Sequence, residues 1–227
     1  MTKTLTILLL TFLIACQQQA KEENTAEESK GQNETPALEE ESQRTVINPN
    51  LATEEELVDT GLSQAMVDRI LKDRPFLDMM DLHGLLSQEK DSTSLALLYG
   101  KLFVPFNINT TAEDNFKLIP GVGDRMAHEF EEYRPYTKIQ QFRKEIGKYV
   151  DEEEVARLEQ YIFVPVELNS ASEEDILALP GVGKRMAHEF EEYRPYKNME
   201  QFRKEIGKYV DEKELSRLER FVYLEKE

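Results

Sequence analysis

Two stretches of this 227-residue chain combine glycines with cations in a way that suits phosphate binding. One reads Leu-Pro-Gly-Val-Gly-Lys-Arg over 179–185, and the other reads Ile-Pro-Gly-Val-Gly-Asp-Arg over 119–125. Because glycine has no Cβ, it adopts positive φ in a tight turn and lets another molecule approach its backbone. The N–H groups of such a turn, together with the N-terminus of the next helix, form a site for an anion such as phosphate.

The later stretch holds the fuller set of candidate anion-binding residues: Gly181, Val182, Gly183, Lys184 and Arg185, with Arg203, Lys204 and Lys208 further along the chain. The earlier stretch supplies a smaller set: Gly121, Val122, Gly123 and Arg125, with Lys148 further along. Asp124 stands where the later stretch has Lys184, and its carboxylate would repel a phosphate. Cations at the start of a helix oppose its dipole at a cost of a few tenths of a kcal/mol, so Lys184 and Arg185 break a local rule in a way that hints at function.

Both stretches belong to a repeat of about sixty residues, which predicts tandem structural units. Residues 109–163 and 169–223 are identical at 34 of 55 aligned positions. A diverged copy precedes them, in which Asn50–Leu57 corresponds to Asn169–Ile176. We therefore expect a first unit at 47–106, a second at 107–166 and a third at 167–227. In the first unit the glycine turn has become Gly61-Leu62-Ser63 and the two cations Gln64-Ala65, so we expect it to serve packing or partner contacts.

Apolar periodicity predicts four short helices per unit and an all-α fold. In the third unit, Ser172 and Asp175 predict a capping box on the first helix, and Pro195 is expected to end the second helix, which runs from about 184 to 193. Another capping box, Asp211 with Glu214, is expected to start the last helix. Its inward residues would be Leu215, Leu218 and Val222. Strand signals are nearly absent, and 103–105 and 163–166 read as extended linkers between units.

These features resemble the helix-hairpin-helix domain of ComEA-type competence proteins. The shared elements are the Asn-x-Ala-Ser/Thr opening, the Leu-Pro-Gly-Val-Gly turn, and the Tyr-Arg that follows the second helix. The likeness covers about 60–227, and it departs from the family where the second hairpin has one glycine (Gly147, Gly207) in place of Gly-x-Gly. The resemblance implies sequence-independent DNA binding through the backbone of the glycine turns.

The charge of the chain favours a different function. The formal net charge is −17, and all three units are acidic, whereas proteins that bind duplex DNA are typically basic. We expect any DNA binding to be weak and salt-sensitive. The alternative function is a structural or protein-interaction module with an envelope protein as partner, in which the hairpins only pack helices.

The N-terminus predicts export and a lipid anchor. Lys3 precedes a short apolar run that ends in Leu13-Ile14-Ala15-Cys16, too few residues to span a bilayer but typical of a signal peptide at 1–15. The last four residues resemble a bacterial lipobox, which implies lipidation of Cys16; an ordinary secretory signal with a chance cysteine is the alternative. Residues 16–46 are polar and acidic without aromatics, which is typical of a disordered tether. We expect the protein to be held at the periplasmic or cell-surface face of the envelope.

No catalytic or cofactor site is expected. Some DNA glycosylases share the Leu-Pro-Gly-Val-Gly turn and carry a nucleophilic lysine two residues after it. Here that position holds Arg125 or Arg185, and an arginine does not deprotonate to act as a nucleophile. Each of the two similar units has a single histidine, His128 or His188, which is too few for a metal site.

Overall fold

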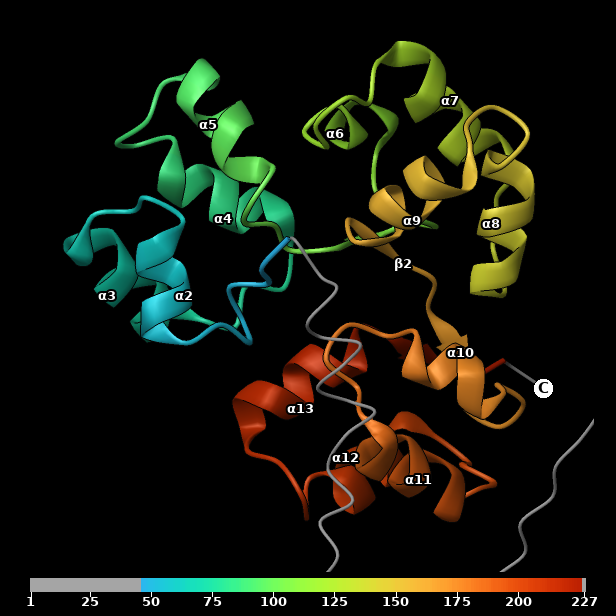
Figure 1. The fold of residues 1–227 in the computed structure, drawn as a ribbon. Coiled ribbons are helices and arrows are strands. Elements are labelled where there is room, and N and C mark those ends of the chain that lie inside the picture. The colour runs from blue at the N-terminus through green and yellow to red at the C-terminus, as the bar shows by residue number, and fades with distance from the viewer. Residues whose placement is uncertain (1–45, 226–227) are drawn as a thin grey trace, which may run out of the picture. The chain divides into compact units, whose positions relative to one another are not determined.

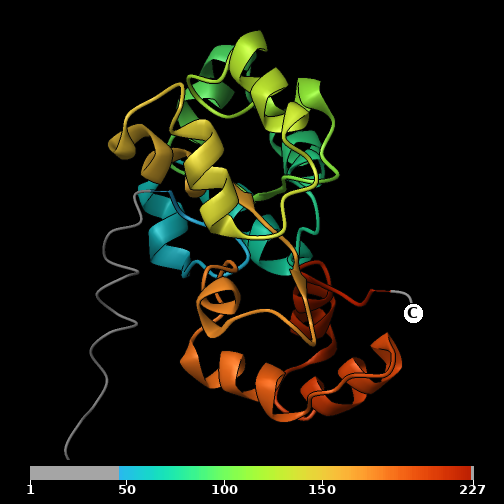
Figure 2. The same ribbon diagram turned by 90° about the vertical axis from the view of Figure 1, so that its right-hand side faces the viewer.

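The computed structural model describes residues 46–225, and within that range the chain consists of helices joined by turns and loops, with strands of only two residues. The helices follow one another in three groups of four, α2–α5, α6–α9 and α10–α13, which Figure 1 separates by colour and Figure 2 shows from the side. The all-α prediction is confirmed. The predicted signal peptide, the lipidated Cys16 and the tether up to residue 45 lie outside the described residues. None of the described helices is long and apolar enough to cross a membrane.

The helix bounds recur from group to group. The first group contains α2 (Glu54–Asp59), α3 (Gln64–Asp73), α4 (Met79–Leu86) and α5 (Ser92–Tyr99). The second contains α6 (Glu113–Phe116), α7 (Asp124–Glu132), α8 (Ile139–Ile146) and α9 (Glu152–Glu159). The third contains α10 (Glu173–Leu177), α11 (Lys184–Glu192), α12 (Met199–Ile206) and α13 (Glu212–Glu219).

The two predicted capping boxes form only in part. Ser172 accepts a hydrogen bond from the N–H of Asp175 and its hydroxyl donates to the Asp175 carboxylate, but that carboxylate accepts no hydrogen bond from the Ser172 backbone. Asp211 accepts from the N–H of Glu214, whose own carboxylate is held by an arginine instead. The complete capping box lies in the first unit, on α2, between Thr53 and Glu56.

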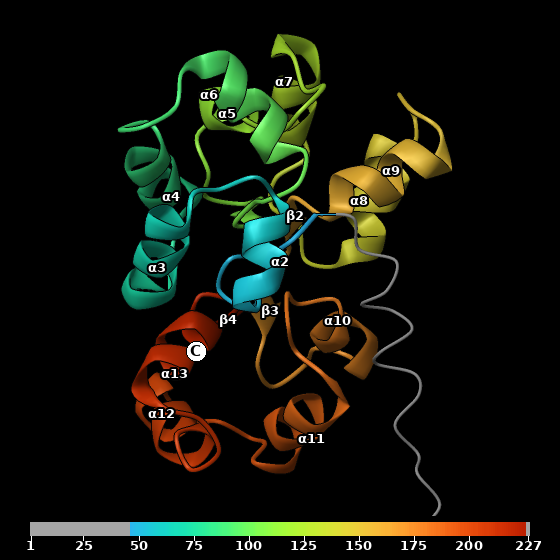
Figure 3. The same cartoon turned by 60° about the vertical axis from the view of Figure 1, so that its left-hand side comes forward.

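The segments predicted as linkers contain or adjoin short parallel strands that join the two ends of each group. β1 (Phe106–Asn107) pairs with β2 (Ile162–Phe163). β3 (Val166–Glu167) pairs with β4 (Val222–Tyr223), whose labels lie side by side in Figure 3. A single bridge between Ile47 and Leu102 does the same in the first group. Val222 is therefore a buried residue of a strand and not of the last helix, which ends at Glu219.

The Asn and Arg of the repeated sequence pattern bind the start of each unit to the segment that follows its second helix. In the third unit, the side chain of Asn169 donates to Tyr196 O at 3.0 Å and accepts from its N–H at 2.6 Å. Arg194 donates from Nε to Leu168 O at 2.6 Å and from Nη2 to Ala171 O at 2.9 Å. The second unit repeats both sets of bonds, so these residues have a structural role.

Buried side chains form two separate apolar clusters. One runs through the first and second units, where Phe103 packs edge-on against Phe106 and Tyr161 with ring centroids 5.2 Å and 5.0 Å apart. The other belongs to the third unit and includes Phe190 and Phe202. The first two units therefore share a core, and the third has its own.

Polar contacts link the third unit to the first. Lys213 donates to Arg74 O at 3.1 Å and to Lys72 O at 3.5 Å, at the C-terminus of α3. Arg220 reaches Pro105 O at 3.5 Å and lies over the Phe163 ring, 5.3 Å from its centroid. Burial of its guanidinium lowers the pKa of Arg220 to about 10. The second unit has a glutamate and a glutamine at these two positions, Glu153 and Gln160.

Candidate nucleic-acid interface

The predicted glycine turns connect α6 to α7 and α10 to α11, and they have the same backbone in both units. Gly121 and Gly181 lie in the left-handed region, at φ +83° and +71°. Val122 and Val182 are buried, and their N–H groups donate to Ile119 O and Leu179 O within the turn, at 3.0 Å and 3.1 Å. The two valines are thus anchors of the turn, and their N–H groups are not available to a ligand, contrary to the sequence prediction.

The N–H groups just after the turn are unused. In the third unit, those of Gly183, Lys184 and Arg185 make no hydrogen bond to any residue in the described range. Gly183 is the N-cap of α11 and has no side chain to accept from them. Gly123 occupies the same place before α7. In the first unit that place holds Ser63, whose hydroxyl accepts from the N–H of Met66 at 3.3 Å.

Glycine at these N-caps is not required by the fold. Gly123 and Gly183 have extended backbones, with φ of −102° and −91°, which any residue adopts. A Cβ placed on either would meet no atom within 4 Å. A capping side chain such as serine would stabilise the helix by a few tenths of a kcal/mol more than glycine does. What the missing side chain provides is access to the backbone from outside.

Lys184 and Arg185 flank these N–H groups as exposed cations. Neither forms an ion pair with the residues that the structure describes. In the second unit, Arg125 lies over the ring of Tyr149, with its guanidinium carbon 5.6 Å from the centroid. The turn of the third unit therefore combines free donors with free positive charge.

The other two predicted cations are engaged by neighbours. Lys208 pairs with Glu205 and lies over the ring of Tyr193 at 4.9 Å; the hydrogen bond that Lys208 donates to Glu205 raises the pKa of Lys208. Lys148 makes the corresponding contacts in the second unit, with Glu145 and with the ring of Tyr133 at 4.7 Å. Their charges are neutralised locally, so Lys148 and Lys208 contribute less to the interface than their sequence positions predicted.

Arg203 is likewise paired with a neighbouring carboxylate, whereas Lys204 stays largely exposed. The Arg203 guanidinium pairs with Glu219. The ammonium of Lys204 lies 3.8 Å from Glu205.

Sequence reasoning missed a cation beside the second turn. The ammonium of Lys117 lies 2.5 Å from the Asp124 carboxylate and 2.8 Å from that of Asp114. Hydrogen bonds to two carboxylates raise the pKa of Lys117, and the bond to Asp114 has a larger effect than the bond to Asp124. The aligned residues of the third unit are Leu177 and Lys184. Each unit therefore has one lysine in this pair of positions, at the first position in the second unit and at the second position in the third. A comparison of the charged residues at aligned positions of the second and third units would have revealed Lys117.

Replacing Asp124 by lysine is expected to strengthen DNA binding by roughly three- to tenfold, because it removes a carboxylate at the turn, adds a cation there and leaves Lys117 with Asp114 as its remaining partner. The measurement is a duplex titration followed by fluorescence anisotropy. Glu132→Lys, at the opposite end of α7, makes the same change in net charge and serves as the control. Equal gains in both variants would show that only net charge matters.

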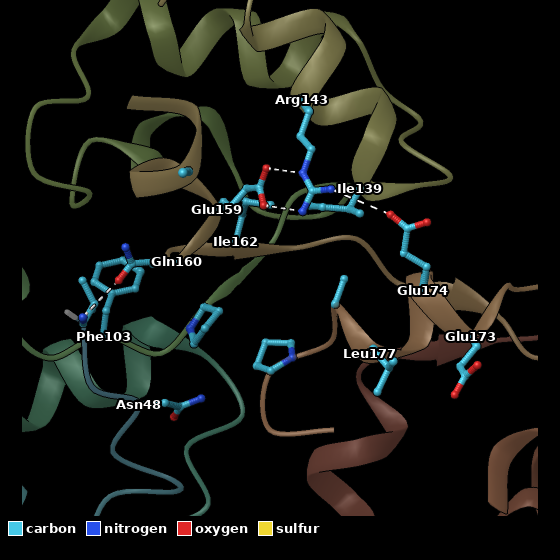
Figure 4. A pocket seen from close by; sticks show the side chains of 15 residues that line it. Asn48, Phe103, Ile139, Arg143, Glu159, Gln160, Ile162, Glu173, Glu174 and Leu177 are labelled. Atoms are coloured by element: carbon cyan, nitrogen blue, oxygen red, sulfur yellow. Dashed lines mark hydrogen bonds and ion pairs between the residues drawn. The ribbon is translucent and has the colours of Figure 1, made fainter. Parts of the chain in front are cut away.

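A cavity of about 620 Å³, with Pro180 among its lining residues, lies between α8, α9 and α10 and the start of the first unit (Figure 4). Arg143 spans it, pairing with Glu159 through two hydrogen bonds of 2.7 Å and 2.9 Å and lying 3.9 Å from Glu174. Glu173 also lines it, so carboxylates outnumber cations. This cavity does not suit an anion.

Comparison with protein families matches residues 161–223 to the helix-hairpin-helix motif. No curated protein matches the chain, and no solved structure does. The matched residues contain the α10–α11 turn, Lys184, Arg185 and the second hairpin of the third unit. The chain therefore carries a helix-hairpin-helix motif, a type of motif that generally binds nucleic acid.

Proposed function

We propose that this protein binds DNA without sequence preference at the bacterial cell envelope, in a role similar to that of ComEA-type DNA uptake receptors. The observation that carries the proposal is the set of uncapped N–H groups at Gly183, Lys184 and Arg185 beside two cations without ion pairs in the described range. A phosphate diester would accept from these donors and neutralise the charge. The first unit, in which Ser63 caps its own helix, is not part of this interface.

The acidic charge of the chain sets the strength of binding. Because the net charge is −17, we expect the protein to neutralise few phosphates. A plot of the logarithm of the affinity against the logarithm of the salt concentration should then have a slope of roughly −2 to −3. Binding would have no catalytic step. The lipidated Cys16 and the tether would hold the interface close to the membrane, so that even a weak site meets DNA at the envelope.

The decisive experiment is a duplex-DNA titration of the full chain at low and moderate salt, with Gly183→Ser alongside. The serine gives α11 the cap that Ser63 gives α3, so the free energy of unfolding should stay the same or rise by a few tenths of a kcal/mol. DNA affinity should fall about fivefold, because the hydroxyl occupies an N–H and the side chain obstructs the backbone.

Ser63→Gly is the reciprocal control, with a small loss of stability and no change in binding. Absence of binding by the unaltered chain at low salt would contradict the proposal.

A second function, contact with an envelope protein, is favoured by the surface of the first unit. Within residues 46–225, the large apolar side chains that are exposed all belong to that unit: Leu51, Val58, Leu77, Met80 and Leu97. Pull-down of an envelope protein by the full chain, lost on replacing Leu77 and Met80 by serine, would establish this role.

A further inference from the structure

A buried arginine of the second hairpin lies directly behind the third unit's glycine turn. Arg217, in α13, is only 1% exposed. It donates from Nη1 to Pro180 O at 2.6 Å, and from Nε and Nη2 to the Glu214 carboxylate at 2.8 Å and 2.6 Å. Its guanidinium carbon lies 5.2 Å from the centroid of the Phe221 ring. Its charge is compensated by Glu214, and its side chain is shielded from solvent.

The contact fixes the peptide that begins the turn. Because a peptide unit is planar, holding Pro180 O also holds the N–H of Gly181 and the plane between them. Nη2 of Arg217 lies 3.2 Å from the point where a Cβ of Gly181 would stand. The arginine therefore supports the turn from inside, while the free N–H groups of residues 183–185 follow two residues later.

The three units differ in whether an arginine supports the turn, and they differ in the same order in whether the Gly-Val-Gly turn is present. In the second unit, Arg157 pairs with Glu154 at 2.6 Å and 2.7 Å, but it makes no hydrogen bond to Pro120 among the residues described, and it is 31% exposed. In the first unit the corresponding position, six residues after the N-cap aspartate of the last helix, holds Leu97. The arginine is thus present where the Gly-Val-Gly turn is present and absent where that turn is lost.

We propose that Arg217 is a positioning residue for the α10–α11 turn, and that it sets the affinity of the turn for phosphate through Pro180 O without contacting the ligand. This inference rests on the proposed function. Hydrogen bonds that involve a charged group are the stronger ones in proteins, so their loss is expected to loosen the turn. The salt dependence of binding should not change, since no phosphate contact is removed.

Arg217→Lys tests the proposal in the full chain, because lysine keeps the charge but lacks the planar fork that reaches Pro180 O and Glu214 together. We expect about fivefold weaker duplex binding with an unchanged salt slope, since one charge-assisted hydrogen bond is lost. Amide exchange of residues 181–185 should accelerate. Arg157→Lys is the matched control, and it should change affinity less than twofold, because Arg157 does not hold its turn. Urea unfolding of each variant establishes the folded fraction during the titrations.

The inference would be overturned by an affinity equal to that of the unaltered chain, or by a loss of affinity no larger than the fall in folded fraction. A reduced salt slope would overturn it too, because Arg217 would then contact phosphate itself. If the unaltered chain binds no DNA, the proposed function fails, and amide exchange alone decides whether Arg217 positions the turn. Faster exchange confined to 181–185 would support that role, and unchanged exchange would exclude it.

Discussion

Replacing Lys184 and Arg185 together by alanine is expected to weaken duplex binding by at least about tenfold, because two phosphate contacts disappear at once. The salt slope should become shallower by roughly two, one for each cation. Stability should stay within about 0.5 kcal/mol, since both side chains are exposed and without ion pairs in the described range. Fluorescence anisotropy at several salt concentrations measures the affinity and its salt slope, and urea unfolding measures the stability.

The matched control is the double variant Lys101→Ala/Lys197→Ala. These two lysines are also exposed, so the change in net charge is identical while the turn is left intact. The control should keep most of the affinity. If both double variants lose binding equally, the interaction is a diffuse electrostatic one and the α10–α11 turn is not the site.

Gly181→Ala is expected to lower the free energy of unfolding by about 2–4 kcal/mol. The residue has φ +71°, and a side chain in the left-handed region costs about 1–2 kcal/mol. Its Cβ would also stand 2.5 Å from Cδ1 of Leu51 and 3.2 Å from Nη2 of Arg217, and such overpacking adds about 1–2 kcal/mol. Urea unfolding of the full chain measures the loss.

Two other glycine turns in the chain provide an internal series. Gly61 has φ +89°, and a Cβ added there would meet no atom within 4 Å, so Gly61→Ala should show the backbone strain alone. Gly121→Ala, where only Arg157 Nη2 lies near at 3.3 Å, should fall between the two. Equal losses at all three positions would show that contacts with Leu51 and Arg217 do not contribute.

Local patterns predicted most of the helical fold. The second helix of the third unit was expected at about 184–193 and runs over Lys184–Glu192, because Pro195 and the apolar spacing act within a few residues. Positive φ at Gly121 and Gly181 likewise follows from the turn alone. The helix-hairpin-helix resemblance rests on the same short-range features, which explains why the family comparison finds it too.

What the sequence did not predict depends on which side chains meet in the folded chain, whether they are near or far apart in sequence. Lys208 looked free in the sequence, but in the structure it pairs with Glu205 and lies over the Tyr193 ring. Arg217 lies 37 residues from Pro180, and nothing in its own helix marks it as support for the turn. The pairing of Lys117 with Asp124 is another such case, since the sequence prediction concerned only the repelling carboxylate of Asp124.

The parallel strands bear on how such a chain grows. Because β3 and β4 pair side by side, a unit begins and ends at nearly the same place. A gene segment that encodes one unit can therefore be duplicated, because the strands of the new copy pair with each other and not with those of its neighbours. The divergence of the copies is consistent with this, since the third unit carries Lys213 and Arg220 where the second has Glu153 and Gln160. Both of these residues contact the first unit, so the third unit differs from the second in the side chains that join it to the first.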